Sequence, residues 1–301
     1  MLLKPAVDLD VLRFLLRGED AGPAAVIDGD EDTHLDSQPA SVSHLHAQEP
    51  FVCAWPGHGM MPHGSHSESN RRCLYRRRVE LQSIWPLFGL EIETPRLLLR
   101  PVRDEDITGL VEAALQGVHD QERMPFGYPW TDAPADELPR NMAQYQWSLR
   151  NRVAPNNWLI AFAVHHEGRV IGSQDLSAHG FADRRTVNTG SWLTRAAQGS
   201  GLGTEMRAAL LSFAFDVLGA EWAESGAASW NAASLGVSKK LGYEPNGVTR
   251  VAPRAGEPGE EQRVRLARDA FVRPEWTITV RGAAPALAQL GVGVAAAGQE
   301  R

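Results

Sequence analysis

Cysteine is scarce in this chain of 301 residues, which contains only Cys53 and Cys73. Two cysteines do not make a disulfide framework, so we expect a reducing, cytoplasmic environment. No apolar run approaches the roughly 18 residues of a membrane-spanning helix. The N-terminal segment is interrupted by Asp8, Asp10 and Arg13, unlike a signal peptide. Positive charge is not in excess either, because the net charge is −7 and the calculated pI about 5.8, which argues against a nucleic-acid-binding surface over the whole protein.

Regular hydrophobic patterning is missing from most of residues 1–84. A helix-like stretch at 7–17 is followed by segments rich in Asp, Gly, Ser, His and Pro, which cannot bury enough apolar surface to offset the entropy of ordering. We therefore predict a largely disordered extension over 1–84. Six of the ten histidines and both cysteines lie there without the spacing of a zinc site, so no metal is expected. The arginine-rich run at 71–78 could contact RNA or the ribosome, but a solvated linker is the simpler interpretation.

From Trp85 onward the apolar residues follow clear periods. The pattern predicts strands at 96–102, two within 158–176 that turn at 166–168, and others at 186–194, 221–229, 247–253 and 262–268, with helices at 104–117, 136–152, 202–218 and 231–242. A loop is expected at 254–261 and an irregular tail at 283–301. This order of elements predicts a mixed α/β (α+β) domain over residues 85–282.

Three glycines, Gly199, Gly201 and Gly203, stand between a predicted strand and a predicted helix. Glycine lets the backbone approach a ligand closely, and the free N–H groups of a helix N-terminus attract phosphate. A P-loop would continue with lysine, whereas this loop continues with Thr204 and Glu205. A dinucleotide fingerprint would need a different glycine spacing within a βαβ unit, and a kinase loop would lie between two strands. The loop therefore favours another phosphate-bearing coenzyme, and a plain strand-to-helix turn is the alternative.

Two motifs carry a resemblance to a known family. Residues 198–203, QGSGLG, resemble the Q/R-x-x-G-x-G/A signature of the GNAT acyltransferases, which bind acyl-coenzyme A. Residues 230–245, WNAASLGVSKKLGYEP, resemble an element of the RimJ/RimL-like branch of that family. The matching positions are Asn231, Ala233, Ser234, Val237, Lys240, Leu241, Gly242 and Tyr243. Within the branch, several segments are most similar to actinobacterial members that include succinyl-coenzyme A-dependent proteins. The resemblance covers about 85–282 and does not extend to residues 1–84.

The resemblance implies a GNAT fold, in which a central, mixed, mostly antiparallel sheet splays open and helices flank it. Pantetheine would lie between the strand at 187–194 and the strand at 221–229. Acetyl-coenzyme A or succinyl-coenzyme A would be the co-substrate, with no metal. The residues expected to contact it are Trp192, Leu193, Thr194, Gln198, Gly199, Ser200, Gly201, Leu202, Gly203, Thr204, Asn231 and Ser234.

The implied reaction is attack of a neutral amine on the thioester. At pH 7, deprotonating a lysine costs roughly 4.6 kcal/mol, whereas an α-amine costs only about 1 to 1.4 kcal/mol. Ser234 is the candidate proton donor near sulfur, and a capping serine is its plainer interpretation. Asn231 is expected to contact pantetheine, to cap the following helix, or both. Tyr243 is expected to pack in the core.

The general base is less well marked. Asp175 and His119 are the candidates, while His179 is expected in a loop and Glu205 as a charge partner of the helix N-terminus. Met124, Phe126, Tyr128 and Trp130 suggest a wall for the acyl group or the acceptor, or simple loop packing. A succinyl carboxylate would need a cation, for which the candidates are Arg123, Arg152, Arg184 and Arg185.

The acceptor amine stays open among a protein N-terminus, a lysine and a small molecule such as an aminoglycoside. A homo-oligomer is possible, and neither a membrane nor a nucleic acid is expected as a partner. A non-catalytic acyl-coenzyme A sensor or scaffold is the main alternative to an enzyme, and release of free coenzyme A with a panel of amines would distinguish the two.

Overall fold

The computed structural model describes residues 79–293. The helix expected at 7–17, residues 1–78 of the disorder expected over 1–84, the histidines and cysteines of that segment, the arginine-rich run at 71–78 and residues 294–301 lie outside the described residues. Within the rest of that segment, residues Leu81–Ile84 form a short helix, which corrects the expectation of disorder there. In the described part, no helix is long and apolar enough to span a membrane. No group of three or more potential metal ligands occurs in that part of the chain either.

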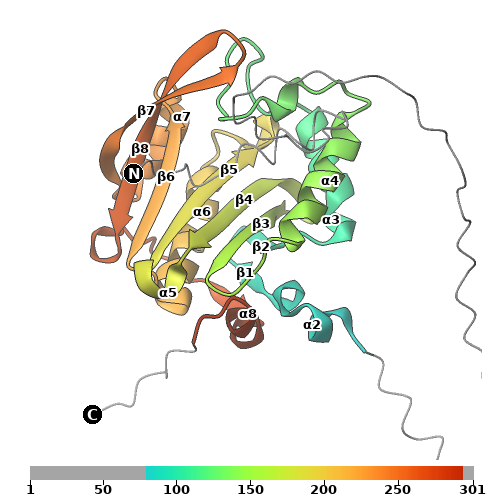
Figure 1. The fold of residues 1–301 in the computed structure, drawn as a ribbon, viewed down its shortest axis with the longest axis vertical. Coiled ribbons are helices and arrows are strands. Elements are labelled where there is room, and N and C mark those ends of the chain that lie inside the picture. Colours follow the sequence, from blue (N-terminus) through green and yellow to red (C-terminus); the bar gives the residue numbers. More distant parts are fainter. Residues whose placement is uncertain (1–78, 294–301) are drawn as a thin grey trace, which may run out of the picture. The chain divides into compact units, whose positions relative to one another are not determined.

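The secondary structure alternates strands and helices along the chain (Figure 1). Its strands are β1 (Glu91–Glu93), β2 (Leu97–Pro101), β3 (Asn157–His166), β4 (Arg169–His179), β5 (Thr186–Leu193), β6 (Trp222–Ala228), β7 (Glu244–Arg254), β8 (Glu257–Ala267) and β9 (Thr279–Arg281). Its α-helices are α2 (Leu81–Ile84), α3 (Asp104–Leu115), α4 (Leu138–Arg150), α5 (Phe181–Arg184), α6 (Leu202–Ser212), α7 (Ala232–Lys240) and α8 (Ala283–Gln289). Short 3-10 turns precede β1 and follow β5 and β8, and a π-helical turn (Phe213–Leu218) extends α6.

The described strands form one sheet of nine, in the order β7-β8-β6-β5-β4-β3-β2-β1-β9. Every neighbouring pair is antiparallel except β5 and β6, which run parallel. A parallel pair needs a crossover, and α6 provides it between these two strands. The predicted mixed, mostly antiparallel sheet is therefore confirmed.

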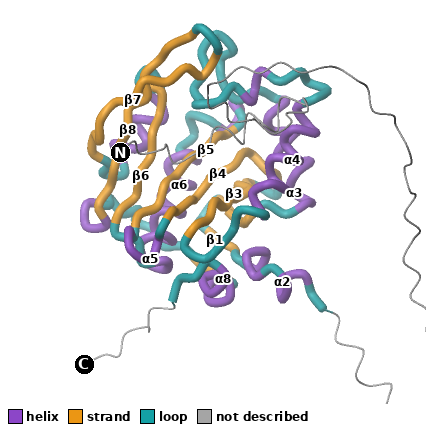
Figure 2. Tube along the Cα trace, in the orientation of Figure 1, coloured by secondary structure: helices purple, strands orange, loops and turns teal. Residues whose placement is uncertain are grey.

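Helices cover the two faces of the sheet, with α3 and α4 on one face and α6 on the other (Figure 2). Side chains of a strand alternate between faces. In β4, Leu176 points into the core around α6, whereas Ser173 and Asp175 point to the face of α3 and α4. Apolar residues of α6 are buried on all of its sides, so it is the central helix of the fold.

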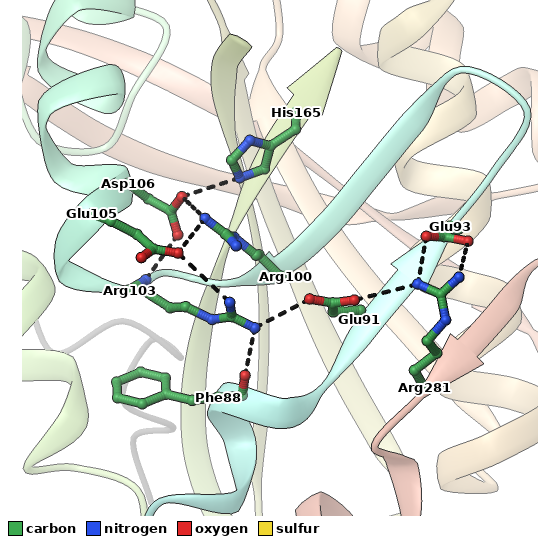
Figure 3. A network of polar contacts seen from close by, with 9 residues as sticks. All are labelled: Phe88, Glu91, Glu93, Arg100, Arg103, Glu105, Asp106, His165 and Arg281. Carbon is green, nitrogen blue, oxygen red and sulfur yellow. Dashed lines mark hydrogen bonds and ion pairs between the residues drawn. The ribbon is translucent and has the colours of Figure 1, made fainter. Parts of the chain in front are cut away.

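A network of ion pairs ties the N-terminal strands to α3 (Figure 3). Asp106 is 2% exposed, and its carboxylate lies 2.7 Å from Arg100 Nη2 and 3.2 Å from His165 Nε2. Its second oxygen accepts the Arg103 backbone N–H at 3.0 Å, which closes the first turn of α3. The Arg103 guanidinium continues the network to Glu91 at 3.2 Å. The network fixes the end of the sheet opposite to β7 and β8.

Two expectations for the C-terminal part are corrected. The loop predicted at 254–261 is mostly strand, because β7 and β8 form one long hairpin whose turn is residues 255–256, with Gly256 at a φ of 78°. The tail predicted as irregular from 283 begins with helix α8, which buries Ala286 and Leu287 in the main core. Pairing with the neighbouring strand β7 forms the first part of β8, and packing in the main core stabilises α8; local composition indicates neither.

Candidate functional site

The sheet opens between β5 and β6. Backbone pairing of these strands runs from Thr186 opposite Trp222 to Thr189 opposite Ser225 and then stops. Beyond that point β5 stays paired with β4 and β6 with β8, so the two strands diverge. The divergence lies where the resemblance predicted it.

The free edge of β5 presents backbone groups to the opening. The Thr189 carbonyl accepts the Ser225 hydroxyl at 2.8 Å, and the Leu193 carbonyl accepts the Gln198 side chain at 2.8 Å. Alternate residues of a strand direct their backbone groups to the same edge. The N–H groups of Ser191 and Leu193 therefore face the opening, where a ligand can bond to them as another strand would.

The glycine loop has a conformation that requires glycine at two of its three positions. Gly199 and Gly201 have φ values of 78° and 85°, and Gly201 is the N-cap of α6. The N–H groups of Gly199, Gly201, Leu202 and Gly203 have no hydrogen-bond partner among the described residues. Glycine at 203 has an ordinary φ, and a Cβ there would lie 3.7 Å from Leu193 Cδ1. The loop thus presents a row of unused donors at the N-terminus of α6.

Arg96 and Glu205 hold this loop in place. Arg96 Nε lies 2.6 Å from Glu205 Oε2, and Arg96 Nη1 donates to the Ser200 carbonyl at 3.1 Å. The Glu205 carboxylate also accepts the Thr94 hydroxyl at 2.6 Å. The Glu205 carboxylate therefore contacts Thr94 and Arg96 rather than the cleft, and it stabilises the position of the loop. Gln198 braces the other side, because its side-chain amide donates to the carbonyls of Val118 and Leu193.

A cleft of about 1400 Å³ runs through the opening. Among the residues expected to contact the coenzyme, Trp192, Leu193, Gln198, Gly199, Gly201, Gly203, Thr204, Asn231 and Ser234 line it. Thr194, Ser200 and Leu202 do not line it, and neither do His179, Glu205 and Tyr243. Tyr243 belongs to the main core and is 7% exposed, as expected.

Asn231 and Ser234 lie at the start of α7, on the β6 side of the cleft. The Asn231 side chain accepts the Ser234 backbone N–H at 3.1 Å, so Asn231 caps the helix as predicted. Because Asn231 supplies the cap, the Ser234 hydroxyl is not needed for it. That hydroxyl has no hydrogen-bond partner among the described residues and borders the cleft.

Asp175 lies on β4 opposite Gly190 of β5, and it lines the cleft. Burial raises the pKa of its carboxyl from the ordinary 3.8 to about 7, although the Ser173 hydroxyl, 3.3 Å away, lowers it. Burial and then the charge of Asp175 raise the pKa of Tyr145 on α4, so this phenol is a neighbour of the carboxyl. A carboxyl that titrates near neutral pH in a cleft suits proton transfer.

His119 also lines the cleft, but both ring nitrogens have partners in its own loop. Its Nδ1 lies 2.7 Å from the Asp120 carbonyl, and its Nε2 lies 2.6 Å from the Thr131 hydroxyl. Since a carbonyl only accepts, Nδ1 carries a proton, and in the neutral ring Nε2 accepts the hydroxyl. The ring is therefore arranged to hold the loop rather than to take a proton from a ligand.

The aromatic segment after α3 forms one wall of the cleft. The ring centroids of Phe126 and Trp130 are 5.3 Å apart, and Trp130 stands 5.3 Å from Trp192 of β5. Tyr128 lines the cleft as well, whereas Met124 is buried away from it. Three of the four residues expected in the wall are thus found in it.

The same segment is bonded to the opposite side of the cleft. Arg254, at the end of β7, makes a two-pronged ion pair with Asp132, with Nε–Oδ2 2.6 Å and Nη2–Oδ1 2.9 Å. Arg123 lies over the ring of Trp230, 5.6 Å from its centroid. In Figure 1 the β7–β8 hairpin reaches toward this loop at the top of the view. These contacts form a roof over the cleft, defined here as residues 119–132 with 249–255.

Among the four arginines expected near an acyl carboxylate, Arg123 lines the cleft. Arg152 follows α4 outside it, while Arg184 and Arg185 lie at α5, at the other end of β5. Three cleft features escaped the sequence patterns: Tyr145, the roof contributed by β7, and Arg207. Arg207 carried a usable signal, because it is a lone cation within the apolar run of α6.

This chain is similar to a known protein family and to several solved structures. A family model described as an acetyltransferase (GNAT) domain matches residues 96–244. RimJ from Mycobacterium smegmatis, solved in complex with CoA-disulfide, is 18% identical over 69% of this chain and 96% of its own, with a TM-score of 0.49. RimL, an alpha-N-protein acetyltransferase solved with coenzyme A, is 16% identical over 59% of this chain and 97% of its own, with a TM-score of 0.48. A GCN5-related N-acetyltransferase from Brucella melitensis is 18% identical over 60% and 79%, with a TM-score of 0.47.

Proposed function

Because the chain belongs to the GNAT acetyltransferase family through the domain at residues 96–244, we propose that it transfers an acetyl or succinyl group from acyl-coenzyme A to a primary amine. One observation carries the proposal most directly. The unused N–H groups of the glycine loop and the open edge of β5 border the same cleft, with Ser234 and Asp175. A phosphate site, a strand edge and two proton-transfer groups in one cleft fit a long phosphorylated thioester and its acceptor.

The residues present fit coenzyme A at two points. The first-turn amides of α6 and the positive-φ glycines form a cradle for phosphate, in which a Cβ at Gly199 or Gly201 would impose strain. The N–H groups of Ser191 and Leu193 face the opening and can bond to the amides of pantetheine. Bound there, the coenzyme would supply an activated thioester.

The proposed chemistry assigns one proton transfer to each side of the cleft. Asp175, directly or through water, accepts a proton from the amine, whose nitrogen forms the new bond to the acyl carbon. The carbon–sulfur bond breaks, and its electron pair goes to sulfur. Ser234 passes a proton from water to the sulfur and is reprotonated by that water, while the proton held by Asp175 leaves to solvent, so both side chains are restored. A carboxyl with a pKa of about 7 matches an α-amine better than a lysine amine.

Binding tests the proposal first. The full chain is titrated by calorimetry with acetyl-coenzyme A and with succinyl-coenzyme A, beside Gly201→Val and the matched control Gly168→Val. Both glycines have positive φ, 85° and 75°, but Gly168 lies in the β3–β4 turn away from the cleft. We expect micromolar binding that Gly201→Val abolishes and Gly168→Val preserves, and the tighter ligand identifies the acyl group. No binding of either ligand by the unaltered protein contradicts the proposal.

Turnover separates the enzyme from a coenzyme-binding sensor. Release of free thiol is followed with peptides bearing a free α-amine, with internal lysines and with small polyamines. We expect release with at least one class, and with α-amines at a lower pH than with lysines. Tight binding without turnover of any amine favours the sensor.

A further inference from the structure

Arg207 is a buried cation without a carboxylate partner in the part of the chain that the structure describes. Its side chain is 4% exposed, its Nη1 donates to the Ser238 hydroxyl at 2.9 Å and its Nη2 to the Ser191 hydroxyl at 3.2 Å. Its Nε has no hydrogen-bond partner among the described residues. No Asp or Glu among residues 79–293 forms an ion pair with it, and the titratable neighbour whose charge acts on it is Tyr243.

Burying an unpaired guanidinium costs free energy unless a bound ligand supplies the opposite charge. A buried charge normally has an opposite charge beside it, because neutral hydroxyls do not replace the lost hydration. Burial accordingly lowers the pKa of the guanidinium, although it stays protonated at neutral pH. Other buried or half-buried arginines of the domain, such as Arg100 and Arg103, do have carboxylate partners. Arg207 differs from them in that it also lines the cleft.

The guanidinium spans the two sides of the opening. Ser191 lies on β5, two residues beyond the last pair with β6. Ser238 lies on α7, one turn after Ser234, and its hydroxyl also donates to the Ser234 carbonyl at 3.2 Å. Arg207 itself lies in the second turn of α6, about 7.5 Å along the axis from the first helical residue. The charge is therefore next to the opening and close to the turn that carries the candidate proton donor.

We propose that Arg207 stabilises the thiolate of coenzyme A as it forms in this opening. The assignment rests on the proposed function. Phosphates fit the glycine loop better, because its unused N–H groups lie at the first turn of α6. The acyl group must reach an amine near Asp175, which faces the α3 and α4 side of the sheet, whereas Ser191 follows Leu193 toward α6. The sulfur is thus the part of the donor left on the side of Arg207 and Ser234.

With this assignment, Arg207 stabilises the negative charge that develops on sulfur when the carbon–sulfur bond breaks. The thiolate forms beside a fixed positive charge in a site of low dielectric, which lowers its proton affinity. The proton is then returned by Ser234 or water, as above. Arg207 itself gives up no proton.

The test compares coenzyme A with desulfo-coenzyme A, which lacks the thiol. Affinities of the full chain are measured by calorimetry from about pH 6 to about pH 9, a range that brackets an ordinary thiol pKa. We expect the preference of the unaltered protein for coenzyme A over the desulfo compound to grow about tenfold or more over this range. Arg207→Met should reduce the growth to about twofold or less, and Arg207→Lys should keep most of it.

Two controls distinguish the proposed role of Arg207 from a purely structural one. Lys239→Met removes a positive charge from the exposed face of α7 next to Ser238 and should leave the preference unchanged. Desulfo-coenzyme A affinity reports whether Arg207→Met still folds and binds. The inference is overturned if Arg207→Met keeps the pH-dependent preference, or if it loses only affinity for succinyl-coenzyme A, which would assign Arg207 to the acyl carboxylate. Failure of the unaltered protein to bind either compound overturns the proposed function itself.

Discussion

Arg254 and Asp132 are 122 residues apart in sequence and form a two-pronged ion pair above the cleft, with Nε–Oδ2 at 2.6 Å. The Arg254 Nη2 also donates to the Gln121 carbonyl at 2.9 Å, so one guanidinium holds the loop at two places. This pair joins the end of β7 to the loop that carries the aromatic wall. If the acceptor binds on that side of the cleft, as proposed, the pair positions the wall for it.

Breaking this pair should loosen the roof without unfolding the domain. For Arg254→Met we expect the KM of the acceptor to rise about 3- to 10-fold with acyl-coenzyme A affinity unchanged, since only the acceptor side loses its positioning. Asp132→Asn should give a similar rise, and the double variant should be no worse than either single one. Additive effects would show that the two residues act separately.

Asp175→Asn removes the proposed base. We expect kcat to fall about 10² to 10³-fold and acetyl-coenzyme A affinity to stay within about twofold. In the unaltered protein, the pH profile of kcat/KM should contain a rise with an apparent pKa of about 7, in addition to the rise caused by deprotonation of the amine. Asp175→Asn should lose this titration, and an unchanged pH profile would move the base elsewhere.

The same substitution should increase stability at neutral pH. The pKa of Asp175 is raised from 3.8 to about 7, so the folded state binds the proton more tightly than the unfolded state does. The free energy of unfolding therefore decreases as pH rises from about 4 to about 7 and stays lower above that. Urea unfolding at about pH 8 should show Asp175→Asn more stable by up to about 4 kcal/mol, the equivalent of the rise in pKa from 3.8 to about 7, with the difference vanishing below about pH 4.

The ionisation of Asp106 has the opposite effect on stability, because its pKa is lowered in the folded protein. Burial raises its pKa, but the hydrogen bonds of His165, Arg100 and the Arg103 backbone outweigh it and lower the pKa from 3.8 to about 2. Its stabilising contribution is present above pH 4 and is lost as pH falls toward 2. Asp106→Asn should cost about 2–4 kcal/mol at pH 7 by urea unfolding, and clearly less at about pH 2.5. An equal cost at both pH values would mean that charge is not what Asp106 contributes.

Substitutions of Asn231 and Ser234 should have different effects, the first on the free energy of unfolding and the second on kcat. Asn231→Ala removes a helix cap and should cost about 1 kcal/mol in thermal or urea unfolding. Ser234→Ala should leave stability nearly unchanged, because the Ser234 hydroxyl bonds no described residue, and should lower kcat about 10- to 100-fold. Loss of stability in Ser234→Ala with normal kcat would reverse these roles.

Sequence periodicity predicted the elements that line the cleft, because each has a strong local pattern. The strand at 186–194 and the helix from residue 202 correspond to β5 and α6, and Gly199 and Gly201 between them have positive φ. Phosphate binding by this loop stays a prediction. The short strands β1 and β9 and helix α8 were missed, since each is too short to show a period and is stabilised by segments far away in sequence. Local patterns of this kind carry no information about such partners.

The sequence did not predict those properties of the site residues, such as charge state and burial, that depend on which distant segments pack around them. Asp175 was a candidate from its place on a strand, but its pKa depends on what covers it. Tyr145 and the Arg254–Asp132 pair join segments that no spacing relates. Arg207 was visible as a lone cation in an apolar helix, yet only the positions of Ser191 and Ser238 reveal where its charge lies.

The opening of β5 from β6 also bears on how this site can change through evolution. The exposed edge of β5 consists of main-chain groups, which substitutions other than by proline preserve, whereas the roof and the aromatic wall are formed by side chains on loops and on the β7–β8 hairpin. Most substitutions would thus leave the main-chain contacts of a ligand along β5 unchanged, whereas substitutions in the roof would alter the side chains that border the cleft. If the proposed function holds, this difference between the two sides of the cleft would let the amine substrate change while the acyl donor stays the same.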